Sequence, residues 1–187
     1  DDYKELIAGD TLAFEPGTEW SYSNTGMFML GVVLESATGE NYFDYVRENI
    51  YEPAGMENTD CYDMDCPIEN LAIGYWPNDE CPGGWKNNYY EHVVRGGPAG
   101  GGFSTCPDLH RFARALVTGK LVSEASTEQL WTDHFEAGYG YGFGVWEGPA
   151  GTGIHAAASG VTAVPAPRHL ADNPDPVQVD VSGWDPT

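Results

Sequence analysis

The sequence predicts a single α/β domain of the α+β kind, in which helices pack against a set of antiparallel strands. Residues 27–34 are apolar apart from one glycine and are followed by Gly39, a pattern typical of a helix that ends at a left-handed glycine. Aromatic residues alternate with glycine along residues 139–146, and apolar residues alternate with polar ones along 177–181. Both patterns favour strands. A chain of 187 residues is long enough to bury one core of this kind.

Three regions are expected within this one domain. They are a helical part over residues 1–56, a variable loop over 57–95, and a glycine-rich turn with helices and strands over 96–187. Residues 3–8 resemble the end of a helix, and Asn41 is placed to cap another over residues 42–50. Within the loop, only residues 71–76 resemble a strand. A segment this long and irregular is often functional.

The third region opens on a turn, residues 96–102, that is mostly glycine. It lacks the lysine of a phosphate-binding loop, so nucleotide binding is not expected. Thr105 or Cys106 is placed to cap a helix with Pro107 in its first turn, and Gly119 would end that helix. The remaining expected elements are a short helix opened by Ser123 or Ser126, and strands over residues 139–146 and 177–181.

The charge of the chain is strongly acidic, with 29 Asp and Glu against 8 Lys and Arg and a net charge of −21. This charge argues against nucleic acid and anionic membranes as partners. Because salt shortens the Debye length to about 3 Å at 1 M, molar salt would screen the repulsion. The composition therefore favours a protein from a high-salt organism, with an acidic surface lacking salt adaptation as the alternative. No apolar run reaches the length of a membrane-spanning helix, so no membrane insertion is expected in this segment.

The four cysteines are too irregularly spaced for a zinc site of the usual kind. They are Cys61, Cys66, Cys81 and Cys106. None of these spacings is C-x₂-C, so no metal is expected. One disulfide within residues 61–81 is the preferred interpretation, with free thiols as the alternative. Such a disulfide would fit an extracytoplasmic or secreted protein.

Tyr22 and Asn24 are the first candidate site residues. In an extended run, residues two apart point to the same side, so these two side chains are expected to share one cleft at the mouth of the apolar helix. Because that helix is apolar on most faces, it is predicted to be buried and rigid. In the alternative interpretation, Tyr22 is a core aromatic residue and Asn24 is the helix N-cap, and Asn24 is also able to fill both roles.

The segment around these residues resembles the β-lactamase-like serine hydrolases, the family of class C β-lactamases, D-alanyl-D-alanine carboxypeptidases and related esterases. Residues 14–59 carry the match, with F-E-P-G-T-E-W-S-Y-S-N-T-G, L-E-S-A-T-G-E-N-Y-F-D-Y-V and P-A-G-M-E-N-T. The family's Tyr-x-Asn motif corresponds to Tyr22-Ser23-Asn24. The P-A-G-G-G and Y-G-Y-G-F stretches resemble later parts of the same family. The resemblance implies the middle and C-terminal part of a β-lactamase/transpeptidase-like fold, in which residues 139–147, around 155 and 177–181 would form neighbouring antiparallel strands.

The family's third motif, Lys-Thr-Gly or His-x-Gly, corresponds to His155, which the resemblance makes the third catalytic candidate. A histidine on a surface strand is the alternative interpretation. Ala156, Ala157 and Ala158 stand where the family has glycine. The first motif, Ser-x-x-Lys, carries the nucleophile. No serine in the chain has a lysine three positions later.

The resemblance therefore implies a serine hydrolase that forms an acyl-enzyme with a β-lactam, a D-Ala-D-Ala peptide or an ester. Its partner would be a small-molecule or peptide substrate, with no cofactor. Because the nucleophile motif is missing, the chain is expected to be a fragment of a larger protein and to be inactive alone. The alternative is a binding or interaction module that keeps this fold without catalysis, which the three alanines after His155 favour.

Overall fold

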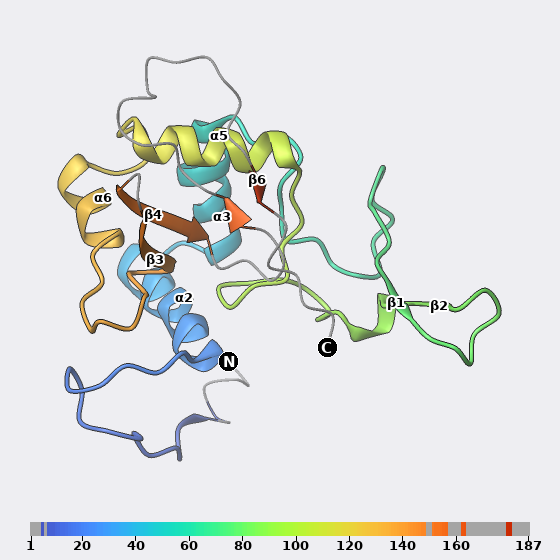
Figure 1. The fold of residues 1–187 in the computed structure, drawn as a ribbon, viewed down its shortest axis with the longest axis horizontal. Helices are drawn as coiled ribbons and strands as arrows, with labels where there is room; N and C mark the ends of the chain where they lie inside the picture. The colour runs from blue at the N-terminus through green and yellow to red at the C-terminus, as the bar shows by residue number, and fades with distance from the viewer. Residues whose placement is uncertain (1–4, 6, 149–150, 157–161, 164–178, 181–187) are drawn as a thin grey trace.

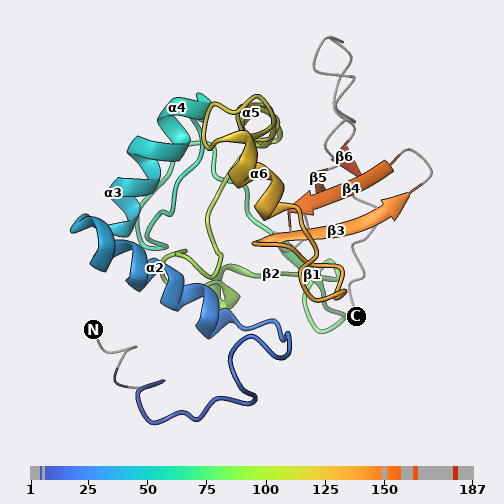
Figure 2. The same cartoon turned by 90° about the vertical axis from the view of Figure 1, so that its left-hand side faces the viewer.

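The computed structural model of the chain describes residue 5 and residues 7–148, 151–156, 162–163 and 179–180. The elements are α2 (Asn24–Thr38), α3 (Tyr42–Val46), η1 (Arg47–Tyr51), α4 (Glu52–Ala54), β1 (Tyr75–Pro77), β2 (Trp85–Asn87), η2 (Tyr89–Glu91), α5 (Cys106–Val117), α6 (Glu124–Leu130), β3 (Phe143–Gly148), β4 (Gly151–Ala156), β5 (Thr162–Ala163) and β6 (Val179–Asp180). Helix α5 lies across the top of the body (Figure 1). Helices α2 to α4 lie on one side and the β3–β4 hairpin on the other, with α6 between them (Figure 2).

Helix α2 begins and ends at clear capping residues. The Ser23 side chain accepts a hydrogen bond from the Gly26 N–H at 3.1 Å, so Ser23 is the N-cap. The N-cap role considered for Asn24 is therefore wrong, because Asn24 is already the first helical residue. At the other end Gly39 has φ 76° and donates its N–H to the Glu35 carbonyl, which confirms the predicted stop.

The burial predicted for α2 is wrong. Gly31 is the helix's one buried residue, whereas Leu30 is 61% and Val33 57% exposed. A run of apolar residues shows that a helix has several apolar faces, but it does not show what covers each face. Within the described residues, α2 packs against α3 and leaves Leu30 and Val33 in contact with solvent.

The glycine-rich turn packs directly on α2 through Gly31. A Cβ atom added at Gly31 would lie 2.1 Å from Cγ of Pro98, so only glycine fits this contact. The turn itself is closed by paired hydrogen bonds between Gly97 and Gly100, at 2.8 and 2.9 Å. Within the turn, a Cβ atom added at Gly96 would lie 2.3 Å from the carbonyl of Gly101, so glycine there also lets two backbone segments pack closely.

Replacing Gly31 with alanine is expected to destabilise the protein by about 1 to 3 kcal/mol, because the methyl group overlaps Pro98. The penalty should exceed the gain of about 0.5 to 1 kcal/mol that alanine normally gives inside a helix. Urea unfolding measures the difference. Gly26→Ala is the matched control on the same helix, since its Cβ would lie 3.5 Å from Ser23 Cβ, in ordinary contact. Equal stability of the two variants would contradict the packing argument.

The second helical segment is longer than its sequence pattern. Asn41 caps it as predicted, since its side chain accepts from the Phe43 N–H. After α3, the chain passes through the π-helical turn η1 into α4, which ends at Gly55 with φ 78°. The predicted helix over residues 42–50 is thus confirmed and extends to Ala54.

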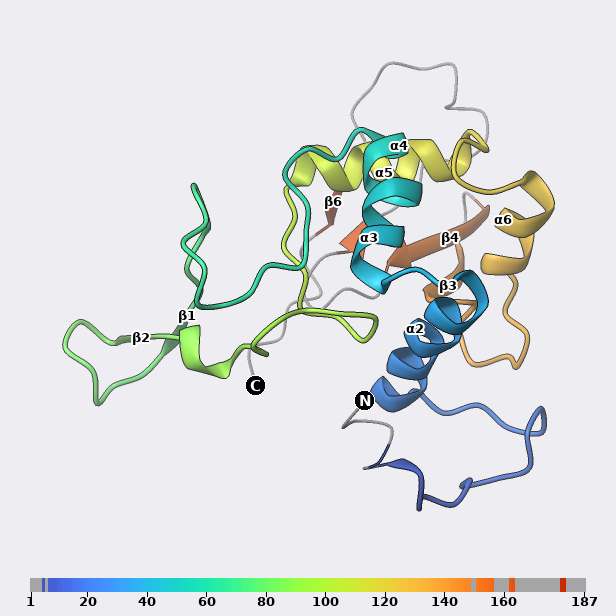
Figure 3. The same cartoon turned by 180° about the vertical axis from the view of Figure 1, so that it is seen from behind.

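The part of the 57–95 region that holds β1 and β2 forms an arm that projects from the body (Figures 1 and 3), whereas Asn58 and Thr59 stay against α5 through hydrogen bonds to Asp108. The strand predicted over residues 71–76 is wrong at its start, because β1 covers only Tyr75–Pro77. Pairing with β2, with Trp76 opposite Lys86, sets these limits. An apolar run becomes a strand only where a partner strand supplies hydrogen bonds, and the run cannot show where the partner starts. The predicted disulfide is also wrong, since all four cysteines are free thiols.

Helices α5 and α6 follow the sequence closely. Thr105 is the N-cap of α5 and Ser123 the N-cap of α6, each accepting from an N–H three residues later. A small core lies between α4 and α5. Its buried members are Ala54, Met56 and Ala115, with Tyr51, Phe112 and Leu121 packed around them.

The strands are confirmed only in part. β3 and β4 form an antiparallel hairpin, but β3 begins at Phe143, and Tyr139 contributes only an isolated bridge to Gly144. β6 pairs with β5 instead of with this hairpin, so the expected adjacency of residues 177–181 to β3 and β4 is wrong for the described pair 179–180. A short alternating pattern identifies a strand without identifying its partner.

Candidate active site

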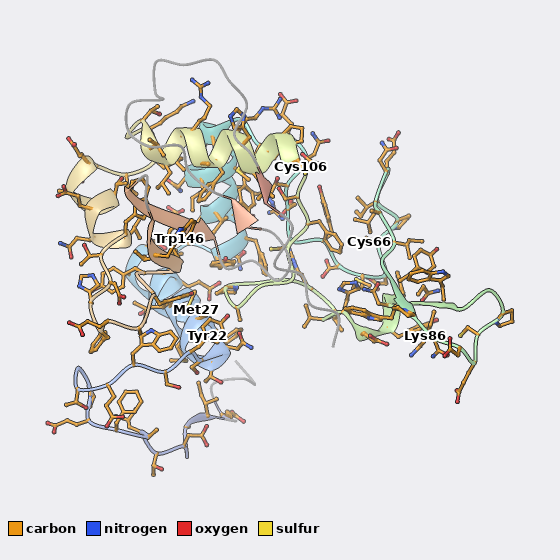
Figure 4. The ribbon with its side chains drawn as sticks, in the orientation of Figure 1. Tyr22, Met27, Cys66, Lys86, Cys106 and Trp146 are labelled. Atoms are coloured by element: carbon orange, nitrogen blue, oxygen red, sulfur yellow. The ribbon has the colours of Figure 1, made fainter. Side chains whose placement is uncertain are left out.

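Tyr22 lies immediately before α2 and is half exposed, at 50%. Its ring contacts that of Tyr139 edge to face, with centroids 6.2 Å apart and an interplanar angle of 80°. The Trp20 ring also contacts Tyr139, at 5.4 Å. Figure 4 shows Tyr22 at the amino end of α2. A side chain this exposed is not a core aromatic residue, so that alternative is wrong.

Asn24 occupies the first position of α2 and is exposed. Because Ser23 already caps the helix, the Asn24 amide is not needed for capping. The backbone at Ser23 is extended, with φ −145° and ψ 116°, as the shared orientation of Tyr22 and Asn24 requires. That both side chains face one cleft stays a prediction.

His155 lies on β4, where its backbone is paired with Gly144 of β3. Gly144 also forms the bridge to Tyr139, whose ring contacts Tyr22. The strand position of His155 is therefore connected to Tyr22 through two backbone pairings and one ring contact. Of the alanines that follow, Ala156 is paired with Phe143. Ala157 and Ala158 lie outside the described residues.

Tyr139 is the residue of this site that the sequence did not identify. Burial and the neighbouring Tyr22 phenol raise the pKa of Tyr139 above its ordinary value of 10.0. Tyr139 is therefore a neutral phenol at physiological pH. The alternation of aromatic residues and glycine around Tyr139 predicts a strand and resembles a stretch of the family, but neither pattern identifies Tyr139 as a contact of Tyr22. The structure gives its ring a specific role as the contact surface for Tyr22.

A buried carboxylate lies at the start of α5. The Asp108 side chain is 0% exposed and accepts hydrogen bonds from the Asn58 N–H at 2.7 Å, the Thr59 hydroxyl at 2.8 Å and the Arg111 guanidinium at 2.6 Å. Burial on its own raises the pKa of Asp108, but these hydrogen bonds outweigh it and hold the pKa below 3.8. In the sequence alone, Asp108 is an acidic residue in the first turn of a helix, a common and favourable position. The structure shows a link between α5 and the segment after α4.

No group of three His, Cys, Asp or Glu side chains is arranged to hold a metal ion in the described part of the chain. The described helices include none with both the length and the apolar character needed to cross a membrane. Lys86, on the β1–β2 arm, is far from Tyr22 in Figure 4 and forms an ion pair with Glu91 at 3.1 Å. The candidate site therefore comprises Tyr22, Tyr139 and the strand that carries His155, and Lys86 is not part of it.

Comparison with solved structures defines the class of fold. The chain is similar to a penicillin-binding protein from Bacillus halodurans, with a TM-score of 0.76 and 29% identity over 88% of this chain and 50% of that one. A D-stereospecific amidohydrolase from Streptomyces shares the fold, with a TM-score of 0.67 at 23% identity over 87% of this chain and 51% of that one. The protein therefore has a β-lactamase/transpeptidase-like fold, of the type found in serine hydrolases.

The particular family follows from the sequence. A sequence model of the Beta-lactamase family matches residues 1–168, and the chain belongs to that family. Penicillin-binding protein 4* of Bacillus subtilis is 33% identical over 147 residues, which cover 70% of this chain and 32% of that protein. The mitochondrial serine beta-lactamase-like protein LACTB of mouse is 32% identical over 64% of this chain and 21% of its own length. The chain thus spans a third or less of these two relatives.

Proposed function

We propose that this chain carries one part of the active site of a serine hydrolase that forms an acyl-enzyme. The observation that carries the proposal is the exposed Tyr22 of a Tyr-x-Asn motif, in ring contact with Tyr139 and connected through β3 to the position of His155. The serine and lysine of Ser-x-x-Lys would come from outside these 187 residues. Substrates of the class of β-lactams, D-Ala-D-Ala peptides or esters fit this chemistry.

The proposed reaction is an acyl transfer in two steps. The serine oxygen adds to the substrate carbonyl as its proton passes to the Tyr22 phenolate, and the leaving group then departs with that proton. Water hydrolyses the resulting ester by the same proton transfer in reverse. A phenol ordinarily titrates near pH 10, so a nearby cation is needed to make it a base at neutral pH. The lysine of the first motif would be that cation.

The other two candidates position the reacting groups. Asn24 would donate a hydrogen bond to the substrate or accept one from the lysine, and His155 would hold Tyr22 or a substrate carboxylate. A binding module without catalysis is the second candidate function. Ala156, Ala157 and Ala158 favour it, because methyl groups replace the glycines that would let substrate approach the strand backbone.

Incubation with a reporter penicillin, followed by mass spectrometry, tests the proposal. The 187-residue chain is expected to stay unmodified, and an extended polypeptide with Ser-x-x-Lys restored upstream is expected to gain one acyl group per molecule. A nitrophenyl ester should likewise be hydrolysed only by the extended polypeptide. An extended polypeptide that binds penicillin without acylation would favour the binding module. A stoichiometric adduct on Ser21, Ser23, Ser104 or Ser159 of the 187-residue chain would show that the nucleophile is one of these serines and not the serine of an upstream Ser-x-x-Lys motif.

The acidic composition leads to a separate proposal, that the protein is adapted to high salt. With 29 acidic and 8 basic residues, screening should relieve repulsion in the folded state. The melting temperature is therefore expected to rise between dilute buffer and molar sodium or potassium chloride. Thermal melts at several concentrations of each salt measure this. A melting temperature that does not change with salt would remove the proposal.

A further inference from the structure

The loop between α6 and β3 is organised around one carboxylate. Asp133 Oδ2 accepts a hydrogen bond from the Gly138 N–H at 2.7 Å, and Oδ1 accepts from Ala137 N–H at 3.0 Å and Phe135 N–H at 3.4 Å. A single side chain therefore satisfies backbone donors along a segment that has no helix or strand of its own. The carboxylate fixes the path of the chain from residue 135 to residue 138.

Asp133 is ionised at neutral pH and suited to this role. Burial acts to raise its pKa, but backbone N–H groups, from Gly138 first and then Ala137, Phe135 and Tyr139, lower it below the ordinary value of 3.8. An ionised carboxylate is only an acceptor, which matches the donors around it. Glu136, inside this loop, has φ 54°. A left-handed non-glycine residue persists where the surroundings hold it, and the Asp133 hydrogen bonds do so.

The same loop places Tyr139. On one side of Tyr139, the Gly138 carbonyl accepts from the Val145 N–H at 2.8 Å, and on the other, Gly140 donates to the Phe143 carbonyl at 2.8 Å. Gly140 also packs against the end of α6, since an added Cβ would lie 2.1 Å from the Leu130 oxygen. The Tyr139 backbone is therefore held between Asp133 and β3.

Tyr139 in turn provides the ring against which Tyr22 rests. Tyr22 is otherwise half exposed, and its contact with Tyr139 restricts the directions in which the phenol can point. Edge-to-face contact is a favoured arrangement of two aromatic rings. Loss of the Asp133 hydrogen bonds would leave Tyr139 held from the β3 side alone, so that its ring could move away from Tyr22.

We propose that Asp133 is a positioning residue for Tyr22, acting through the loop over residues 135–139 and the Tyr139 ring. The proposal rests on the proposed function, because Tyr22 is there the group that transfers the proton. It adds a residue that touches neither substrate nor nucleophile. Proton transfer depends on the placement of the phenol oxygen, so a displaced Tyr139 lowers the rate without removing any reacting group.

The first experiment uses the 187-residue chain and does not depend on activity. The chain is deuterated except at tyrosine and tryptophan, and Tyr22→Phe and Tyr139→Phe assign the two rings. The nuclear Overhauser effect between Tyr22 and Tyr139 is expected in the natural chain and lost in Asp133→Ala. Asp79→Ala, at an exposed aspartate in the turn after β1, is the matched control and should keep it. Asp133→Asn retains one acceptor oxygen and should recover part of the signal, and it replaces the alanine variant if that variant does not fold.

The second experiment measures kinetics in the extended polypeptide with Ser-x-x-Lys. Asp133→Ala is expected to lower kcat by about 10- to 100-fold with little change in KM. Asp133→Ala combined with Tyr139→Ala should be no slower than Tyr139→Ala alone, because both changes remove the same contact. An intact ring contact in Asp133→Ala, or an unchanged kcat, would overturn the proposal. If the unmutated extended polypeptide is never acylated, the proposed function fails. In that case the nuclear Overhauser effect between Tyr22 and Tyr139 alone shows whether Asp133 positions Tyr22.

Discussion

Replacing Asp108 with alanine is expected to lower the free energy of unfolding by about 2 to 5 kcal/mol. The Asp108 carboxylate is fully buried and accepts from the Asn58 N–H and the Thr59 hydroxyl, and removal leaves both donors without this acceptor. Arg111 contributes less to this loss, because its side chain is 45% exposed and can return to water. Urea unfolding at neutral pH measures the change.

The matched control is Asp44→Ala, which removes another aspartate paired with an arginine three residues away. Asp44 is 65% exposed, so its pair with Arg47 is expected to contribute less than about 1 kcal/mol to the free energy of unfolding.

The dependence of stability on acid pH provides a second measurement of the Asp108 contribution. Because hydrogen bonds hold the pKa of Asp108 below 3.8, its stabilisation is complete above that pH and is lost as pH falls through the lower value of the folded state. When the pH is lowered, the Asp108→Ala variant should therefore lose less stability than the unmutated chain loses. Equal losses of stability in Asp108→Ala and Asp44→Ala would contradict the role of Asp108 in linking α5 to the segment after α4.

Replacing Tyr22 with phenylalanine in the extended polypeptide is expected to slow acylation by about 10²- to 10⁴-fold, the usual contribution of general acid–base transfer. The ring remains, so the contact with Tyr139 and the stability of the fold should be retained. Stopped-flow acylation with a reporter penicillin measures the rate, and thermal unfolding shows that the variant is folded.

Asn24→Ala is the comparison for Tyr22→Phe, because Asn24 is proposed to position groups and not to transfer protons. Its rate loss should therefore be smaller than that of Tyr22→Phe. A Tyr22→Phe variant that acylates at the unmutated rate would remove Tyr22 from the proton path. The proposed function would then need a different base.

Capping and turn chemistry made much of the local structure predictable from the sequence. Gly39, Asn41 and Thr105 limit their helices as expected, because each role depends on the residue and its immediate neighbours. The family resemblance on residues 14–59 led to the correct fold, since a long run of matching residues carries more information than a local pattern. The assignment of Tyr22, Asn24 and His155 as catalytic remains a prediction.

The features that the sequence did not reveal all depend on contacts between distant segments. Asp108 receives two of its three side-chain hydrogen bonds from residues 49 and 50 positions away, and no local pattern distinguishes it from an exposed acid. Tyr139 and Tyr22 are likewise brought together only by the fold. The exposure of Leu30 and Val33 on α2 has the same cause, because burial depends on neighbours that a helix pattern does not specify.

The outward apolar face of α2 has a consequence for the colloidal behaviour of the isolated chain. Leu30 and Val33 favour association between molecules, whereas a net charge of −21 keeps the molecules apart in dilute buffer. Molar salt weakens that repulsion and strengthens attraction between apolar surfaces at the same time. Salt therefore changes both the internal stability of each molecule and its tendency to aggregate. Melting curves at several protein concentrations separate the two, because only aggregation depends on concentration.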